Sequence, residues 1–254
     1  MTPDPHLISA VRFLTVLPTP HTDDALRPDW LARALRYFPL VGAGIGIASA
    51  CVWLIAGDWW SPTIGALLAV AASIAITGAL HEDGLADTAD SFGGGWSVEK
   101  RLAIMKDSRI GTYGALALGI GVALRVAALA MLPPWIGAAA LVAAHALARA
   151  TPGFVMNRLR YAGDTAAMKV SYAEVPVPPP EIRAVLLFAA LATLPLLMLS
   201  PRSALLGLVL GVLLASLLAR WSRRLLGGYT GDVLGAIEQL CEIGFLLGVA
   251  AVIG

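Results

Sequence analysis

Three aspartates in one short segment are the residues best suited to chemistry in this sequence. Asp83, Asp87 and Asp90 are spaced at i, i+4 and i+7. On a helix, this spacing places the three carboxylates within an arc of about 60°. Like charges in this arrangement destabilise a helix unless a cation neutralises them, and hard oxygen ligands favour Mg²⁺ or Ca²⁺. We expect a divalent-cation site here; the alternative is a solvated first helical turn whose acids complement the helix dipole.

A second segment combines cations, hydroxyls and glycines just before an apolar run. It contains Lys106, Ser108, Arg109 and Thr112, and it ends at Gly114. Amides at the start of a helix lack intrahelical partners, and the helix dipole favours anions there, so this composition suits phosphate oxygens. The alternative is a positively charged membrane anchor followed by a helix N-cap.

Carboxylates also occur inside the last apolar run of the chain. Thr230 and Asp232 precede this run, and Glu238 and Glu242 lie within it at i and i+4. An acid inside a membrane helix is costly, so it normally faces the bundle interior and marks an ion or a functional path. We expect such a role for both glutamates; the alternative is a pair of buried acids that bond to arginine or serine and serve helix packing.

The amino-acid composition is too apolar for a water-soluble protein, so we expect the segments that contain these acids and cations to lie in a membrane. Of 254 residues, 58% are hydrophobic and only 14% charged, and the mean hydropathy is +0.77. Soluble domains carry about a quarter charged residues. The net charge of +1 excludes the basic balance of a nucleic-acid-binding protein. Cys51 and Cys241 lie in apolar runs without metal-ligand spacing, so we expect neither a disulfide nor a zinc site.

Seven apolar runs are long enough to cross a bilayer, which takes about 20 residues. They lie near 40–56, 62–80, 111–132, 134–150, 184–200, 203–219 and 233–253. Gly42, Gly44 and Gly46 fall inside the first run, where small residues are typical of close helix packing. The sequence therefore predicts an all-α, polytopic membrane bundle of about seven transmembrane helices, with residues 1–254 forming one domain.

The basic residues predict the orientation of this bundle. Short turns alternate with long polar stretches, of which the internal ones lie near 81–110, 151–183 and 220–232. All Lys and Arg residues except Arg125 and Arg202 lie in or beside the long stretches. Because cations accumulate on the cytoplasmic side, we expect the N-terminus, the long loops and the site at the cytoplasmic face of a bacterial inner membrane.

The motifs together resemble those of one enzyme family. They are His81-x-Asp83-Gly-Leu-Ala-Asp87-Thr-x-Asp90, Met105-Lys-Asp-Ser-Arg-Ile-Gly-Thr-Tyr-Gly114 and Gly228-x-Thr-Gly-Asp232-x-Leu-Gly-Ala236. With the N-terminal Phe13-Leu-Thr-x-Leu-Pro18-x-Pro20, they are similar to the cobalamin synthase family, the adenosylcobinamide-GDP ribazoletransferases. This resemblance implies a Mg²⁺-dependent membrane enzyme that joins α-ribazole or its 5′-phosphate to adenosylcobinamide-GDP and releases GMP. It also leaves open self-association or association with other cobalamin-assembly enzymes.

Roles for individual residues follow as hypotheses. We expect Asp83, Asp87 and Asp90 to bind Mg²⁺, completed by Asp232 or Glu238, with Asp83 and Asp87 also serving catalysis. Asp107 or Glu242 would accept the proton of the attacking ribazole hydroxyl. The substrates would be held by His81, Lys106, Ser108, Arg109, Thr112, Thr230, Arg158 and Arg160. Because a corrinoid exceeds the size of an ordinary pocket, we also expect an open cavity at the cytoplasmic face.

Two other classes of protein stay open at the level of the sequence. Asp83 and Gly84 echo the metal motif of CDP-alcohol phosphotransferases, although Asp87 stands where that motif has arginine and its downstream part is missing. Alternatively, Glu238 and Glu242 could be the coupling acids of an ion-coupled carrier. Release of GMP from a GDP-linked corrinoid would separate the expected enzyme from both.

Overall fold

The computed structural model describes residues 4–20, 27–163 and 175–253, and the regular elements of these residues are all helices. They are α1 (Pro5–Leu14), α2 (Trp30–Ala34), the short 3₁₀ turn η2 (Leu35–Tyr37), α3 (Phe38–Trp59), α4 (Pro62–Thr77), α5 (Leu80–Gly94), α6 (Val98–Met105), α7 (Thr112–Ala130), α8 (Pro134–Met156), α9 (Pro179–Leu199), α10 (Pro201–Leu226) and α11 (Gly231–Ile253). The predicted all-α bundle is confirmed.

Within the described residues, six helical segments are each long and apolar enough to cross a membrane. They are Trp30–Trp59, which ends with α3, and then α7, α8, α9, α10 and α11. The bent pair of α4 and α5 passes the same test when counted together, and its 91° bend is that of a broken span or a re-entrant loop; counted as one span, it brings the number to the seven expected. Pro62, Pro134, Pro179 and Pro201 stand at helix starts, where the missing amide of proline costs nothing.

Several boundaries differ from the predicted loops. The expected loop 81–110 contains α5 and α6, and α10 continues to Leu226, well into the expected segment 220–232. Likewise α8 extends to Met156, while residues 164–174 of the expected loop 151–183 lie outside the described residues. The boundaries differ because hydropathy identifies only the residues that suit a lipid environment. A helix can extend beyond them through polar residues wherever its backbone hydrogen bonds continue.

A sharp bend separates α4 from α5. The two helices meet at 91°, and the residues between them, Gly78 and Ala79, both adopt left-handed backbone conformations with φ of 62° and 59°. Glycine takes this conformation freely, whereas for alanine it costs about 1–2 kcal/mol. The bend turns the acid-bearing helix α5 away from the direction of the apolar helix α4.

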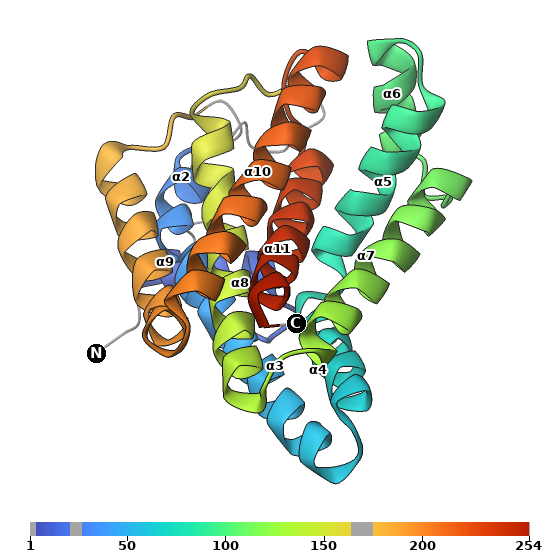
Figure 1. Ribbon diagram of the computed structural model, residues 1–254. Helices are drawn as coiled ribbons and strands as arrows, with labels where there is room; N and C mark the ends of the chain where they lie inside the picture. The colour runs from blue at the N-terminus through green and yellow to red at the C-terminus, as the bar shows by residue number, and fades with distance from the viewer. Residues whose placement is uncertain (1–3, 21–26, 164–174, 254) are drawn as a thin grey trace.

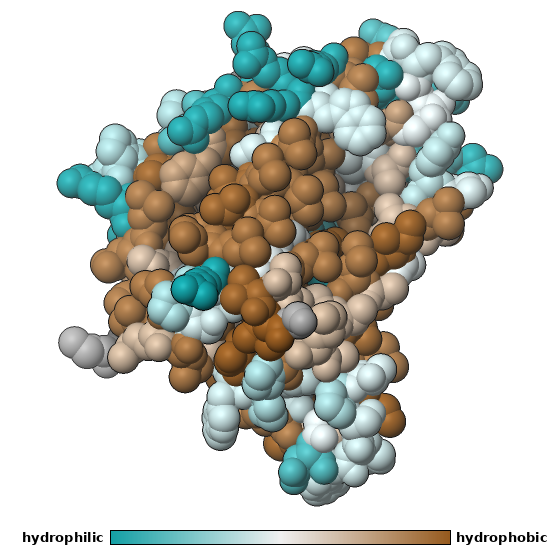
Figure 2. Space-filling model, viewed as in Figure 1, coloured by the Kyte–Doolittle hydropathy of each residue, from teal (hydrophilic) through white to brown (hydrophobic). Residues whose placement is uncertain are grey.

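The two ends of the bundle differ in their connections. Figure 1 shows the short turns α3–α4 and α7–α8 at the lower end and α6, the start of α7 and the start of α11 at the upper end. We call these the short-loop end and the long-loop end. Figure 2, in the same view, shows hydrophilic residues gathered at the long-loop end above a broad hydrophobic surface. This distribution matches a bundle that crosses a bilayer between its two ends.

The helices α8 and α11 form the centre of the bundle. In the most apolar stretch of each helix, 78% of the residues of α8 and 72% of those of α11 are buried. In α9 this share is 17%, so α9 faces outward. Glycines allow the closest approaches: a Cβ at Gly42 of α3 would strike the backbone of His145 on α8, and one at Gly46 would lie 2.6 Å from Val142 Cα. The expected packing role is confirmed for these two glycines, while Gly44 faces open space.

Candidate active site

A cluster of carboxylates lies where α5 passes the start of α11. The helix α5 carries Asp83, Asp87 and Asp90, and the first turn of α11 carries Asp232. Gly84 permits this approach, because a Cβ at that position would lie only 2.7 Å from the carbonyl oxygen of Asp232. The tertiary structure thus joins the first and third sequence motifs through a contact that only glycine allows.

The electrostatics of this cluster favour a cation. Asp87 is partly buried, and the negative charges of Asp83, Asp232 and Asp90 act on its carboxylate. Among the described residues, no basic side chain forms an ion pair with Asp83, Asp87 or Asp232. Unneutralised carboxylates are therefore held together at the long-loop end of the bundle.

The carboxylate oxygens of this cluster are donors of the kind that a hard cation such as Mg²⁺ binds. Within the described part of the chain, no three or more His, Cys, Asp or Glu side chains converge as a preformed metal site. Mg²⁺ usually keeps several waters and is held by one or two carboxylates together with substrate phosphates. Asp83, Asp87 and Asp232 can supply such oxygens, with Asp83 exposed to solvent.

Asp90 has a different environment from the other acids of α5. One of its carboxylate oxygens accepts a hydrogen bond from the amide of Gly111 at 2.7 Å, and the other accepts one from Gly114 at 2.9 Å. These amides belong to the start of α7 and have no partner within that helix. Asp90 therefore caps α7 from a distant part of the sequence, so we leave it out of the metal site proposed below.

The predicted phosphate-binding segment connects α6 to α7 at the long-loop end. Lys106, Ser108, Arg109 and Thr112 are all exposed there. Arg109 forms a two-point ion pair with Asp107, with Nη2 2.6 Å from Oδ2 and Nε 3.0 Å from Oδ1. Hydrogen bonds from Arg109 lower the pKa of Asp107 to about 2. This carboxylate is therefore a weak proton acceptor, which weakens its predicted role as the base.

Thr230 is buried beneath the site rather than open to substrate. Its hydroxyl accepts a hydrogen bond from the amide of Val233 at 3.3 Å and donates one to the sulfur of Met105 at 3.6 Å. The side chain thus caps the first turn of α11 and ties it to the end of α6. The structure gives Thr230 a structural position, so we do not propose it as a substrate ligand.

Arg158 and Arg160 follow the end of α8, and both are exposed at the long-loop end. The segment of Arg160 pairs with the loop before α11: Tyr229 donates its amide to Arg160 O at 2.9 Å, and Ala162 donates to Tyr229 O at 2.7 Å. A Cβ at Gly228 would strike the carbonyl of Arg160. This short β-bridge brings Arg160 close in space to the helix that carries Asp232.

A buried polar network lies below the carboxylate cluster, and sequence reasoning did not find it as a unit. Arg125 of α7 contacts Glu82 of α5 at 3.0 Å and Glu242 of α11 at 3.2 Å through Nη1. Gln239 donates a further hydrogen bond to Glu82 at 3.1 Å. The one indication of this network in the sequence is Arg125, because a cation deep in an apolar helix requires a nearby acid.

The other half of the network holds the remaining predicted residues. His81 Nε2 lies 3.0 Å from a carboxylate oxygen of Glu238, and Arg149 Nη1 lies 2.9 Å from Glu242. His145 Nδ1 lies 3.0 Å from the same oxygen of Glu242. All five side chains are buried. Glu238 and Glu242 are therefore buried acids that contact histidine and arginine between the helices, which is the packing alternative; neither has the open position that a metal ligand or a base would need. His81 is buried with them and is not exposed.

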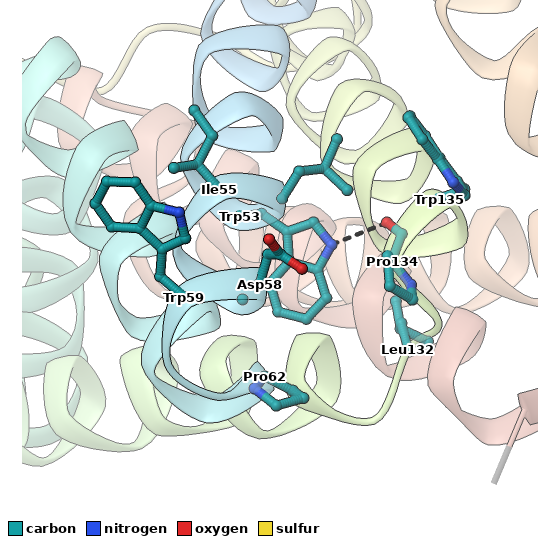
Figure 3. A pocket seen from close by; sticks show the side chains of 10 residues that line it. Trp53, Ile55, Asp58, Trp59, Pro62, Leu132, Pro134 and Trp135 are labelled. Carbon is teal, nitrogen blue, oxygen red and sulfur yellow. Dashed lines mark hydrogen bonds between the residues drawn. The ribbon is translucent and has the colours of Figure 1, made fainter.

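A cavity of about 510 Å³ lies at the short-loop end, away from these residues (Figure 3). This cavity is not the open cytoplasmic cavity that we expected for the corrinoid beside the carboxylates, and that cavity stays a prediction.

Comparison with known proteins identifies the family. The family described as cobalamin-5-phosphate synthase matches residues 6–250 of the chain. The chain belongs to this cobalamin-5-phosphate synthase family. The match extends from α1 to α11, so it includes the carboxylate cluster, the segment before α7 and the buried network.

Similar members of the cobalamin-5-phosphate synthase family are named adenosylcobinamide-GDP ribazoletransferase. The chain is 45% identical to the protein of Azorhizobium caulinodans, with 95% of this chain and 93% of the relative covered. It is 45% identical to that of Bradyrhizobium diazoefficiens, covering 95% and 92%, and 42% identical to that of Leptothrix cholodnii, covering 94% and 92%. No solved structure gives a significant match.

Proposed function

We propose that this membrane enzyme joins α-ribazole or its 5′-phosphate to adenosylcobinamide-GDP and releases GMP. The observation that carries the proposal is the near full-length similarity to relatives named for this activity, at 42–45% identity. The product would be adenosylcobalamin or its 5′-phosphate. The described geometry supports the proposal with clustered carboxylates and exposed cations at one end of the bundle.

The reaction replaces a phosphoanhydride bond with a phosphate ester bond. A ribazole hydroxyl oxygen attacks the phosphorus attached to the corrinoid, the pyrophosphate P–O bond breaks, and GMP leaves with the bridging oxygen. The hydroxyl proton must pass to a base, and negative charge develops on the departing phosphate. Such a displacement needs positive charge near the pyrophosphate and an uncommitted carboxylate near the hydroxyl.

We assign these tasks to residues at the long-loop end. Asp83, Asp87 and Asp232 would hold Mg²⁺, which when bound neutralises charge on the pyrophosphate. Lys106 and Arg109 would bind the phosphates of the GDP group. Asp107 and Glu242 are committed to ion pairs, so we propose neither of them as the base.

The site would lie at the cytoplasmic face of a bacterial inner membrane. The long-loop end carries nearly all the basic residues, which is the pattern of a cytoplasmic face. Nucleotide-linked substrates are also cytoplasmic molecules. The carrier alternative receives little support, because its proposed coupling acids are both buried beside Arg149, whose Nε lies 3.5 Å from Glu238 and whose Nη1 lies 2.9 Å from Glu242. Self-association and partner enzymes remain predictions.

The deciding experiment measures GMP release by the detergent-purified protein. It supplies adenosylcobinamide-GDP and α-ribazole, with Mg²⁺ or with EDTA, to the wild type and to Asp83→Asn. Glu99→Gln is the matched control, because Glu99 is an exposed acid on the neighbouring helix α6. We expect ribazole-dependent, Mg²⁺-dependent release that Asp83→Asn abolishes and Glu99→Gln preserves. Absence of release from folded wild-type protein would overturn the function, whereas equal release by Asp83→Asn would move the metal elsewhere.

A further inference from the structure

The cavity at the short-loop end has a composition suited to a ligand. It lies between the end of α3, the start of α4 and the turn that leads from α7 to α8 (Figure 3). Its volume is about 510 Å³, and its walls include Trp53, Trp59, Trp135 and Asp58. None of the residues assigned to the proposed reaction lines it.

The charge of this cavity is negative. Asp58 is the charged residue among those that line it, and no described side chain forms an ion pair or hydrogen bond with its carboxylate. Asp58 stands in the last turn of α3, which contains no basic residue. The C-terminal end of a helix is itself partially negative, so carboxylate and helix end both attract a cation.

The indole rings around this cavity are of the kind that an ammonium group contacts favourably. Trp53 is fixed because its Nε1 donates a hydrogen bond to Pro134 O at 2.9 Å. Figure 3 shows Asp58 in front of Trp53, with Trp59 and Trp135 to either side. Aromatic faces attract ammonium ions at exposed positions too, although the attraction there is modest; Asp58, Trp59 and Trp135 are all exposed. A carboxylate in a cavity that three indoles also line can therefore combine hydrogen bonding with cation–π attraction.

The position of the cavity points to a lipid as the source of the ammonium group. Trp59, Trp60 and Trp135 are exposed at this end, where tryptophans lie at the level of lipid headgroups. Ile55 lines the cavity and is also exposed, which offers an apolar path for an acyl chain. The helices α4 and α8 begin at the rim, and helix starts favour the phosphate that accompanies the ammonium in a zwitterionic headgroup.

We propose that this cavity binds one phosphatidylethanolamine molecule from the membrane leaflet at the short-loop end. The ammonium group contacts Asp58 and the surrounding indoles, and the acyl chains extend along the side of α3. The site is separate from the proposed transferase site and does not depend on that function being correct.

The test is native mass spectrometry of the full chain in detergent. The protein is titrated with phosphatidylethanolamine and, separately, with phosphatidylglycerol of the same acyl chains. We expect one molecule of phosphatidylethanolamine to bind preferentially, and we expect Asp58→Asn to weaken this binding about fivefold. Glu99→Gln is the control, because Glu99 is an exposed acid near the exposed Trp96 at the opposite end, without this cavity.

Two further measurements keep the test decisive. Asp58→Asn must retain the melting temperature and GMP release of the wild type, since Asp58 touches neither the bundle network nor the carboxylate cluster. Equal binding of the two lipids, or unchanged binding in Asp58→Asn, would overturn the proposal. Displacement of the lipid by an equal concentration of free ethanolamine would also overturn it, because the site would then recognise an amine rather than a lipid.

Discussion

At the scale of the residue, Asp87 and Asp90 show how neighbours decide what an acid does. Both lie on the same face of α5, as the spacing predicted. Asp87 faces other carboxylates, whereas both oxygens of Asp90 accept amide hydrogen bonds from the start of α7. One carboxylate is therefore left to attract a cation, and the other stabilises a helix.

Asp87→Asn should lower activity and raise stability without metal. The charges of Asp83 and Asp232 repel the ionised side chain of Asp87 in the folded protein, so ionisation of Asp87 weakens stability as the pH rises from acid towards neutrality. In EDTA at pH 7.5, we expect the variant to melt about 2 °C higher than the wild type and at pH 4 to melt alike. GMP release should fall about 100-fold. Thermal melting and GMP assays test this; a variant that melts lower in EDTA at pH 7.5 would contradict the repulsion.

Asp90→Ala should lower stability by about 2 kcal/mol, because two helix-start amides lose their partner. Asp90→Asn keeps one acceptor oxygen and should recover about half of that loss. Denaturant unfolding in mixed micelles measures both values. If Asp90 were a metal ligand instead, both variants would lose the stabilisation that Mg²⁺ gives to the wild type, as Asp87→Asn should.

At the scale of the element, the buried network fixes the helix that carries the site. Residues at the start of α5, His81 and Glu82, contact α11 through Glu238 and Gln239, and Arg125 links Glu82 to α7. Buried charges are costly unless they are paired, so this arrangement strongly favours one position of α5. The position of the cluster aspartates therefore depends on buried side chains outside the cluster.

Gly84→Ala tests whether the approach of α5 to α11 matters for activity. Its Cβ would lie 2.7 Å from the Asp232 carbonyl, which forces the two helices apart. We expect GMP release to fall at least about tenfold, because small displacements of catalytic groups are costly. Gly119→Ala on α7 is the control, since its Cβ would meet open space. Equal activity of the two variants would argue against a site shared between α5 and α11.

At the scale of the whole molecule, the bundle has two ends of opposite character. The long-loop end carries the cluster and the exposed cations, and the short-loop end carries tryptophans and the lipid cavity. In our proposals, the transferase site therefore lies on one side of the membrane, and the lipid site lies in the leaflet on the opposite side.

The orientation can be measured by labelling cysteines in intact cells. In a variant lacking Cys51 and Cys241, Lys100→Cys marks the long-loop end and Arg202→Cys the short-loop end, and both positions are exposed. We expect a membrane-impermeant maleimide to label position 202 in spheroplasts and position 100 only after lysis. The reverse pattern would place the site outside the cytoplasm.

The sequence by itself determined the features that depend on local properties. Hydropathy and run length predicted the helical bundle, and the spacing of Asp83 and Asp87 placed them on one helix face. These predictions succeeded because a bilayer imposes length and apolarity on each segment separately. The sequence also placed Glu238 and Glu242 correctly inside the last span, without revealing their partners.

Only the tertiary structure decided which polar groups meet. It paired Arg125 with Glu82 and Glu242, directed Asp90 to α7 and brought Asp232 to Gly84. These contacts join residues far apart in the chain, so no local spacing specifies them. They form because a buried charge or an uncapped helix start must find a partner wherever the packed helices offer one.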